Sequence, residues 1–175
     1  AQGARTHLYS KIEAQVAGLP SGIGTNWTIQ GVKALSLRFY GLTTNAVEPM
    51  WVQLSDGAKT YGNKVTYGDY DDENPNAIAE DSWHEWFIDM GDFGVELNNV
   101  VSLVIGIGTE GSATQGGSGT VYFDDFRLYT PVCRPARHTA AMAKLDFAPL
   151  GAPDCVVNYE EIDVMADDWL QTDAV

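Results

Sequence analysis

The sequence predicts a mainly β protein, a sandwich or a barrel, with a small α-helical appendage at its C-terminal end. Three observations support this prediction. Before Pro131, apolar residues alternate with polar ones along several short segments, as they do in half-buried strands. Glycine, asparagine and aspartate interrupt these segments at close intervals, which is typical of all-β folds. After Pro131 the apolar spacing changes to that of a helix.

Five segments have the period of two that strands require. In each of them, one face is formed almost entirely by apolar residues. In chain order, the expected buried faces are Leu35, Leu37 and Phe39; Met50, Val52 and Leu54; Trp86, Ile88 and Met90; Val101, Leu103, Ile105 and Ile107; and Val121, Phe123 and Asp125. We expect turns at residues 55–57, 61–63 and 116–119.

The last part of the chain predicts a helix. Its apolar stripe consists of Ile162, Met165, Ala166, Trp169 and Leu170. Asn158 stands where an N-cap belongs, and Glu161 three residues later completes a capping-box pattern. Residues 140–144 indicate a second, shorter helix. We therefore divide the chain into a β-sandwich, residues 1–130, and a helical tail, residues 131–175.

The charge of the chain limits its partners. The 175 residues include 24 Asp and Glu and 10 Lys and Arg, for a net charge of −14. Such a surface repels phosphate backbones and anionic lipids, so we expect no nucleic-acid partner. The longest nearly uncharged apolar run, residues 100–108, is about half of what a bilayer-spanning helix needs, so we expect no membrane insertion. The acidity suits a soluble exported protein or one that binds calcium through carboxylates, and Ala1 looks like a mature or trimmed start.

Cys133 and Cys155 are the two cysteines of the chain. A disulfide between them is favoured over two free thiols, and it would stabilise the tail by about 3 kcal/mol in the loop-entropy model. It would also imply an oxidising compartment.

Four segments of the chain resemble a known family. They are GVKALSL at 31–37, EPMWVQLSD at 48–56, SWHEW at 82–86 and GTVYFDDFRL at 119–128. Together they resemble the galactose-binding-like jelly rolls of exported planctomycete-type bacterial proteins, which in turn look like several carbohydrate-binding modules. The resemblance covers about residues 7–130. It implies a jelly-roll β-sandwich, and members of this group carry one more strand ahead of residues 6–11.

The tail resembles a dockerin-like segment that often follows such modules. In this resemblance Asp154, Asn158 and Glu161 match positions 5, 9 and 12 of a calcium-binding loop. Positions 1 and 3 fall on Leu150 and Ala152, which have no side-chain oxygen. A metal-free loop held by the disulfide is therefore the alternative to calcium.

The jelly-roll resemblance also implies a second place for structural calcium. Asp124 and Asp125 stand on the last expected strand, where an Asp pair often helps to hold the ion. A buried Asp needs a cation or several donors to offset the loss of its hydration. The alternative is that one carboxylate accepts backbone N–H groups and the other is solvated.

Sugar binding requires exposed aromatic faces, because a pyranose ring presents an apolar patch of C–H groups. The alternation places Trp51 on the outward face of its strand. The expected carbohydrate-binding residues are Trp51, Tyr61, Tyr67, Tyr70, Arg38 and Gln53. The alternative is that Trp51 packs under a loop or against a neighbouring subunit, and Trp83 and Trp86 are expected in the core or in edge packing.

No sequence pattern of a hydrolase or a phosphate-binding loop is present, and adjacent acidic residues on a strand point to opposite faces. We therefore expect a protein that is not an enzyme. The first hypothesis is a non-catalytic extracellular carbohydrate-binding or adhesive module whose partner is a polysaccharide or another glycan. The alternative is a structural subunit that assembles with copies of itself into an extracellular filament or surface layer, by strand complementation at an open sheet edge.

Overall fold

The structure is a computed structural model, and it describes residues 9–18, 24–58, 60–112, 116–131 and 159–171. The chain separates into two compact units, residues 1–132 and residues 133–175. The first unit contains all seven strands of the described residues, and the second contains one helix. The two units are described separately below.

The first unit is built from short strands that are linked by turns and single turns of 3-10 helix. The strands are β1 (Tyr9–Gln15), β2 (Ala34–Tyr40), β3 (Met50–Asp56), β4 (Val65–Thr66), β5 (Trp83–Asp89), β6 (Val100–Gly108) and β7 (Tyr122–Tyr129). The 3-10 helices are η1 (Val16–Gly18), η2 (Ile29–Gly31), η3 (Pro75–Ala79), η4 (Met90–Phe93) and η5 (Leu97–Asn99).

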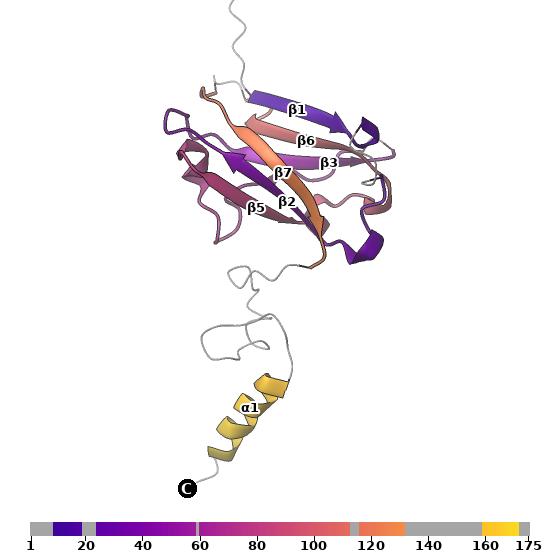
Figure 1. Cartoon of the computed structure of the whole chain (residues 1–175), viewed down its shortest axis with the longest axis vertical. Coiled ribbons are helices and arrows are strands. Elements are labelled where there is room, and N and C mark those ends of the chain that lie inside the picture. The colour runs from indigo at the N-terminus through magenta and orange to yellow at the C-terminus, as the bar shows by residue number, and fades with distance from the viewer. Residues whose placement is uncertain (1–8, 19–23, 59, 113–115, 132–158, 172–175) are drawn as a thin grey trace, which may run out of the picture. The chain divides into compact units, whose positions relative to one another are not determined.

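The strands form two antiparallel sheets that pack face to face (Figure 1). Sheet A has the order β1-β6-β3-β4, and sheet B has the order β5-β2-β7. This arrangement confirms the expected mainly β sandwich. Both sheets bury one face in the core, which explains the alternation of apolar and polar residues in the sequence. On sheet A, the outward-facing Trp51, Ser102 and Val104 are buried as well.

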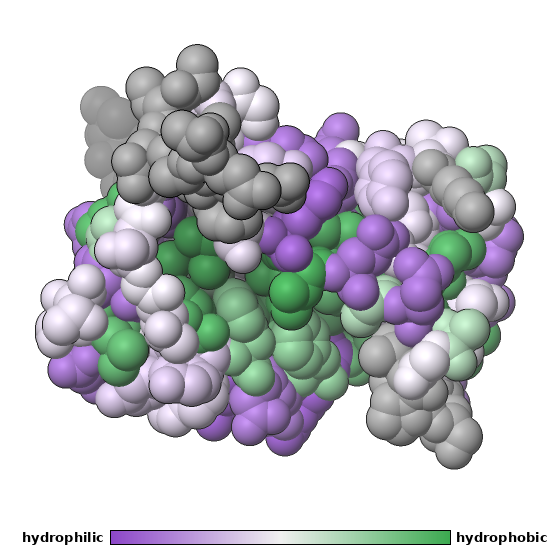
Figure 2. Space-filling model, turned by 90° about the horizontal axis from the view of Figure 1, so that it is seen from above, coloured by the Kyte–Doolittle hydropathy of each residue, from purple (hydrophilic) through white to green (hydrophobic). Residues whose placement is uncertain are grey.

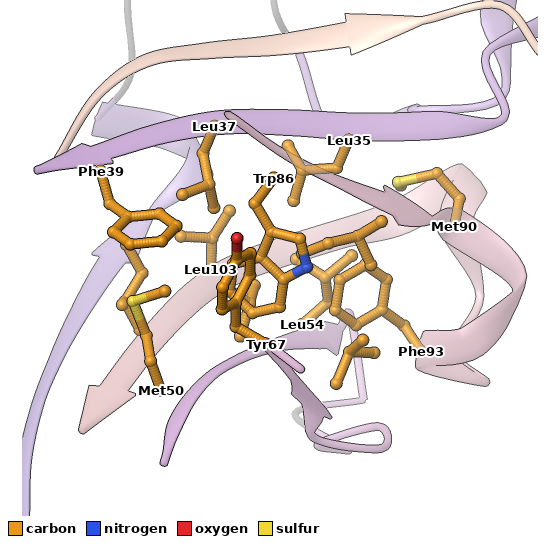
Figure 3. Packing of buried hydrophobic residues seen from close by; sticks show 14 of the residues in the cluster. Leu35, Leu37, Phe39, Met50, Leu54, Tyr67, Trp86, Met90, Phe93 and Leu103 are labelled. Carbon is orange, nitrogen blue, oxygen red and sulfur yellow. The ribbon is translucent and has the colours of Figure 1, made fainter. Parts of the chain in front are cut away.

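The core lies between the two sheets and is centred on aromatic residues (Figure 3). Phe39 of β2 and Trp86 of β5 are fully buried, and Tyr67, which follows β4, lies against both. The ring of Tyr67 meets Phe39 edge-on at 4.8 Å and Trp86 at 5.4 Å, measured between ring centroids. Such edge-to-face pairs add about 0.5–1.5 kcal/mol beyond the burial of apolar surface.

Most of the expected strands are observed, but the two ends of the first unit differ from the expectation. The segment Tyr9–Gln15 forms β1 and pairs with β6. Its residues are mostly exposed, and their sequence lacks the apolar and polar alternation that predicts a strand. In β7, the expected alternation ends at Asp125, which has a positive φ of 59° within a bulge. Asp accepts this left-handed conformation better than most residues, so the strand continues beyond it.

The second unit contains the helix α1 (Tyr159–Gln171), which confirms the helix expected after Asn158. Its first turns expose Ile162 and Met165, whereas Glu161 is buried. The second helix expected at residues 140–144 lies outside the described residues. Among the helices that the structure describes, none has the length and apolarity needed to cross a membrane.

A pair of substitutions on β2 tests the arrangement of the sandwich. Leu37 is completely buried, so Leu37→Ala should lower the free energy of unfolding by about 2–5 kcal/mol in urea titration. Its neighbour Arg38 is exposed on the opposite face, so Arg38→Ala should change it by no more than about 0.5 kcal/mol. Equal effects of the two substitutions would contradict this orientation of β2.

Candidate functional site

The outer face of sheet B carries a row of aromatic side chains. The register of the three strands places Trp83 of β5, Tyr40 of β2 and Tyr122 of β7 side by side. The ring centroid of Tyr40 lies 5.4 Å from that of Trp83 and 6.4 Å from that of Tyr122. Trp83 is 51% exposed and Tyr122 is 53% exposed. Strands lie about 4.8 Å apart, so the row spans about 10 Å across the sheet.

A row of charged side chains lies next to the aromatic row. Arg38 of β2 stands between Glu85 of β5 and Asp124 of β7 in the strand register, and all three residues are exposed. The hydroxyl of Ser36 donates a hydrogen bond of 3.2 Å to the Glu85 carboxylate. Donors and acceptors of hydrogen bonds therefore lie beside the exposed rings. We call Trp83, Tyr40, Tyr122, Arg38, Glu85 and Asp124 the aromatic face.

The packing of β2 holds the aromatic face in place. Leu35, Leu37 and Phe39 point into the core, so the residues between them point outward. A slip of one residue in the strand pairing would expose these three apolar side chains, so the register is fixed. The site is thus built on a strand whose other side is fully buried.

The β7 bulge borders the aromatic face and explains the acidic pair on this strand. Asp124 accepts a hydrogen bond from the backbone N–H of Asp125, and the Asp125 carboxylate forms an ion pair with Arg127 at 2.6 Å. Arg127 also donates a hydrogen bond of 3.4 Å to the Tyr129 hydroxyl. The hydrogen bonds to the Tyr129 hydroxyl and the Asp125 carboxylate raise the pKa of Arg127.

The structure places Trp51 differently from the expectation for a sugar-binding residue. Trp51 is on the outer face of sheet A, as the alternation predicted, but only 3% of it is exposed. Its indole lies flat over Gly106 of β6, its N–H donates to the Gly108 carbonyl at 3.0 Å, and the Lys64 ammonium lies 4.1 Å from the ring. The predicted exposure of Trp51 is wrong because a glycine on the neighbouring strand gives the ring a place to pack.

The other expected sugar-binding residues do not gather at one place. Tyr67 is buried in the core, and the predicted surface role is wrong for this residue. Tyr70 packs partly against the core and donates a hydrogen bond to Asp92. Gln53 donates to the Gly62 carbonyl at 2.7 Å, and the exposed Tyr61 donates to Glu13 at 3.1 Å. Arg38 belongs to the aromatic face on the other sheet.

Trp83 and Trp86 separate in the structure. Trp86 is fully buried, as expected, whereas Trp83 stands on the edge strand β5, packs against Tyr40 and is exposed, so it is not a core residue. The difference follows from their spacing of three residues, because residues an odd number apart on a strand point to opposite faces. This parity was the signal in the sequence that identifies Trp83 as a surface residue.

The calcium and disulfide predictions stay predictions. Within the described ranges, no group of three or more His, Cys, Asp or Glu side chains is placed to hold a metal ion. Asp154, Asn158, Cys133 and Cys155 lie outside the described residues. Glu161 is buried in the first turn of α1.

Comparison with protein-family models gives no match, and neither does comparison with curated proteins. Among solved structures, the chain is similar to the crystal structure of a β-1,2-glucanase from Parabacteroides distasonis, with a TM-score of 0.46 and 21% sequence identity. The match covers 71% of this chain and 17% of the glucanase chain, so this chain spans a small part of that protein's length.

The Trp51 packing yields a prediction about Gly106. A Cβ atom at Gly106 would lie 2.0 Å from Cζ2 of Trp51, so Gly106→Ala should displace the indole. We expect a loss of about 1–3 kcal/mol in unfolding free energy, with a change in indole fluorescence. Gly18→Ala is the control, because a Cβ there has no neighbour within 4 Å. Unchanged stability and emission in Gly106→Ala would contradict the packing.

An ion-pair network beside Trp51 yields a prediction about pH. The Glu110 carboxylate lies 2.6 Å from the Lys64 ammonium and 3.0 Å from that of Lys11. The hydrogen bond from Lys64, followed by that from Lys11, lowers the pKa of Glu110 to about 2. An unfolded Glu has a pKa of about 4.3, so this contribution to stability is complete above about pH 4.3 and is lost as the pH falls toward 2.

Urea titrations of the wild type and Glu110→Gln, from about pH 6, which lies above this window, down to about pH 2, check this sign. The stability difference between the two proteins should shrink as the pH falls through this window. A difference that stays constant over the whole range would show that Glu110 keeps an ordinary pKa in the folded protein.

Proposed function

We propose that this chain is a non-catalytic carbohydrate-binding or adhesive module that holds a neutral polysaccharide on the aromatic face. The observation that carries this proposal is the exposed row of Trp83, Tyr40 and Tyr122 across three strands. Aromatic rings on a solvent-exposed sheet offer apolar planes on which the C–H face of a sugar ring stacks. The rings stand on a rigid sheet, so little conformational entropy is lost when a ligand binds.

The charged row supports a ligand with hydroxyl groups. A guanidinium group such as that of Arg38 donates hydrogen bonds to a ligand, and carboxylates such as those of Glu85 and Asp124 accept them from it, so both roles of a sugar hydroxyl are matched. The row holds two negative charges and one positive charge, in a protein with a net charge of −14. Polysaccharides rich in uronic acid or sulfate would be repelled. We therefore propose a neutral glycan as the ligand.

Binding accounts for these side chains better than catalysis does. A glycoside hydrolase needs a carboxyl group whose surroundings keep it protonated, so that it can act as a general acid. Glu85 and Asp124 are both exposed, and Arg38 lies between them in the register. Neither carboxyl group lies in the buried, apolar surroundings that a general acid of this kind needs. The proposed module works outside the cell or at its surface, where polysaccharides are found.

Two substitutions on the aromatic face test the proposal. Trp83→Ala and Tyr122→Ala should each raise the Kd for an extended neutral glucan at least about tenfold, which corresponds to losing about 1.4 kcal/mol or more. Tyr61→Ala is the matched control, because Tyr61 is 50% exposed but lies beside sheet A. Glycan arrays followed by calorimetry measure the effect, and thermal unfolding verifies that each variant folds.

The Tyr61→Ala control can also contradict the proposal. Loss of binding in Tyr61→Ala with unchanged binding in Trp83→Ala would move the site to sheet A and overturn the proposal. The same glucan, oxidised at C6 to carry carboxylates, should bind more weakly, and added salt should reduce the difference. Absence of binding to every neutral glycan on an array would refute the proposed function.

A further inference from the structure

The sandwich has an opening on the side where β1 faces β7. A cavity of about 390 Å³ lies there, between the two sheets. Its walls include the apolar side chains of Ile12, Ile105, Ile107, Ile78, Val121 and Phe123. In Figure 2, which looks onto this side of the molecule, hydrophobic atoms lie in a recess between more polar rims. We call this opening the β1–β7 groove.

The described part of the groove is a built structure rather than a loose gap. Asn45 donates hydrogen bonds to the carbonyls of Ile78 and Thr120, each at 2.8 Å, and accepts one from the Thr120 N–H. The Ala46 N–H donates to the Ser118 carbonyl at 2.9 Å. These bonds fix the segment that leads into β7 to the loop between β2 and β3.

The inner face of β1 has no strand above it among the described residues. Ile12 pairs with Ile105, which is in the core, so Ile12 points toward the interior of the sandwich. Ile12 is nevertheless 62% exposed. Ser10 and Ala14, on the same face, are exposed as well. Sheet A reaches one strand further than sheet B on this side.

The strand β7 forms the other wall of the groove and has a free edge there. Within the described ranges, β7 pairs only with β2, so the N–H and C=O groups on its other side lack a strand partner. It is eight residues long. A free edge next to exposed apolar residues is a template for one further strand.

We propose that the β1–β7 groove accepts residues 1–8 of a second copy of this chain, which add to sheet B as a strand beside β7. These residues immediately precede β1. Eight extended residues span about 26 Å, which matches the length of β7. Ala4, Thr6 and Leu8 would share one face, toward the groove, and Arg5 and His7 the other, toward solvent.

Charge complementarity supports this occupant. Residues 1–8 contain Arg5 and no acidic residue, whereas residues 9–131 contain 16 Asp and Glu and six Lys and Arg. The segment is thus attracted to the sandwich as a whole, while the groove itself is lined by the acidic Glu48 and the basic Lys11. The helix α1 of the second unit is itself acidic, so it has no charge complementary to the sandwich.

A second copy suits the groove better than the chain's own residues 1–8. To enter its own groove, the segment would have to leave β1 at Tyr9 and reverse direction. A reversal uses about four residues, so residues 5–8 would form the turn and could not pair with β7. A segment that continues straight from β1 keeps all eight residues extended and reaches a neighbouring molecule.

The proposed contact joins different surfaces of the two copies. Each molecule gives residues 1–8 to one neighbour and receives the same residues from another. Such a head-to-tail interface continues from molecule to molecule and produces linear chains unless a ring closes. We therefore expect the full chain to form multimers whose size rises with concentration.

Two variants test the proposal, one without the donor segment and one with a blocked groove. Deletion of residues 1–8 removes the donor and leaves the groove intact. Ile12→Arg keeps the donor and places a charge inside the groove. By mass photometry and analytical ultracentrifugation, each variant alone should be monomeric. Mixed in equal amounts, they should form 1:1 heterodimers, because the intact donor of Ile12→Arg can enter the intact groove of the deletion variant.

Gln15→Arg is the matched control, because Gln15 is exposed on the outer face of the same strand and should leave assembly unchanged. Circular dichroism and thermal unfolding verify that all variants fold. A wild-type protein that stays monomeric at every concentration would overturn the proposal. Continued assembly of the deletion variant, or absence of heterodimers in the mixture, would overturn it as well.

Discussion

The packing of β2 against β3 is the interaction on which the rest of the structure depends. Leu35, Leu37 and Phe39 face Met50, Val52 and Leu54 across the sandwich, and all six are almost completely buried. Because successive side chains of a strand point to opposite faces, burying one row of β2 determines the outer row. Tyr40 and Arg38 therefore take central positions on the aromatic face, between the side chains of β5 and β7.

The unequal width of the two sheets is the second constraint. Sheet A has four strands and sheet B has three among the described residues, so one strand of sheet A, β1, is covered on neither face. This explains why an isoleucine that points toward the interior is nevertheless exposed. Apolar surface in contact with water costs about 25 cal/mol per Å², which favours any segment that covers it. The same geometry that completes the core between β2 and β3 thus leaves the groove open.

The sequence predicted the strands whose two faces differ in polarity, and the helix whose apolar stripe is regular. It did not predict β1, because a strand exposed on both faces carries no alternation. The sugar-binding site was misplaced for a related reason. Alternation tells which face of a strand Trp51 is on, but its burial depends on Gly106, which is far away in sequence and adjacent only through strand pairing. The aromatic face likewise unites residues from β2, β5 and β7 through register, which no local pattern contains.

The aromatic face and the β1–β7 groove both include residues of β7, and this common strand links the two proposals. The outer side chains Tyr122 and Asp124 belong to the aromatic face, while Phe123 and the free edge of β7 belong to the groove. A strand added beside β7 would turn an edge strand into an interior strand and widen sheet B from three strands to four. The bulge at Asp125, next to Asp124, would then be held from both sides. A strand added beside β7 that shifts its outer side chains would therefore change the affinity of the aromatic face for a glycan. Because coupling between two binding equilibria is reciprocal, a bound glycan would change the affinity for the added strand by the same factor.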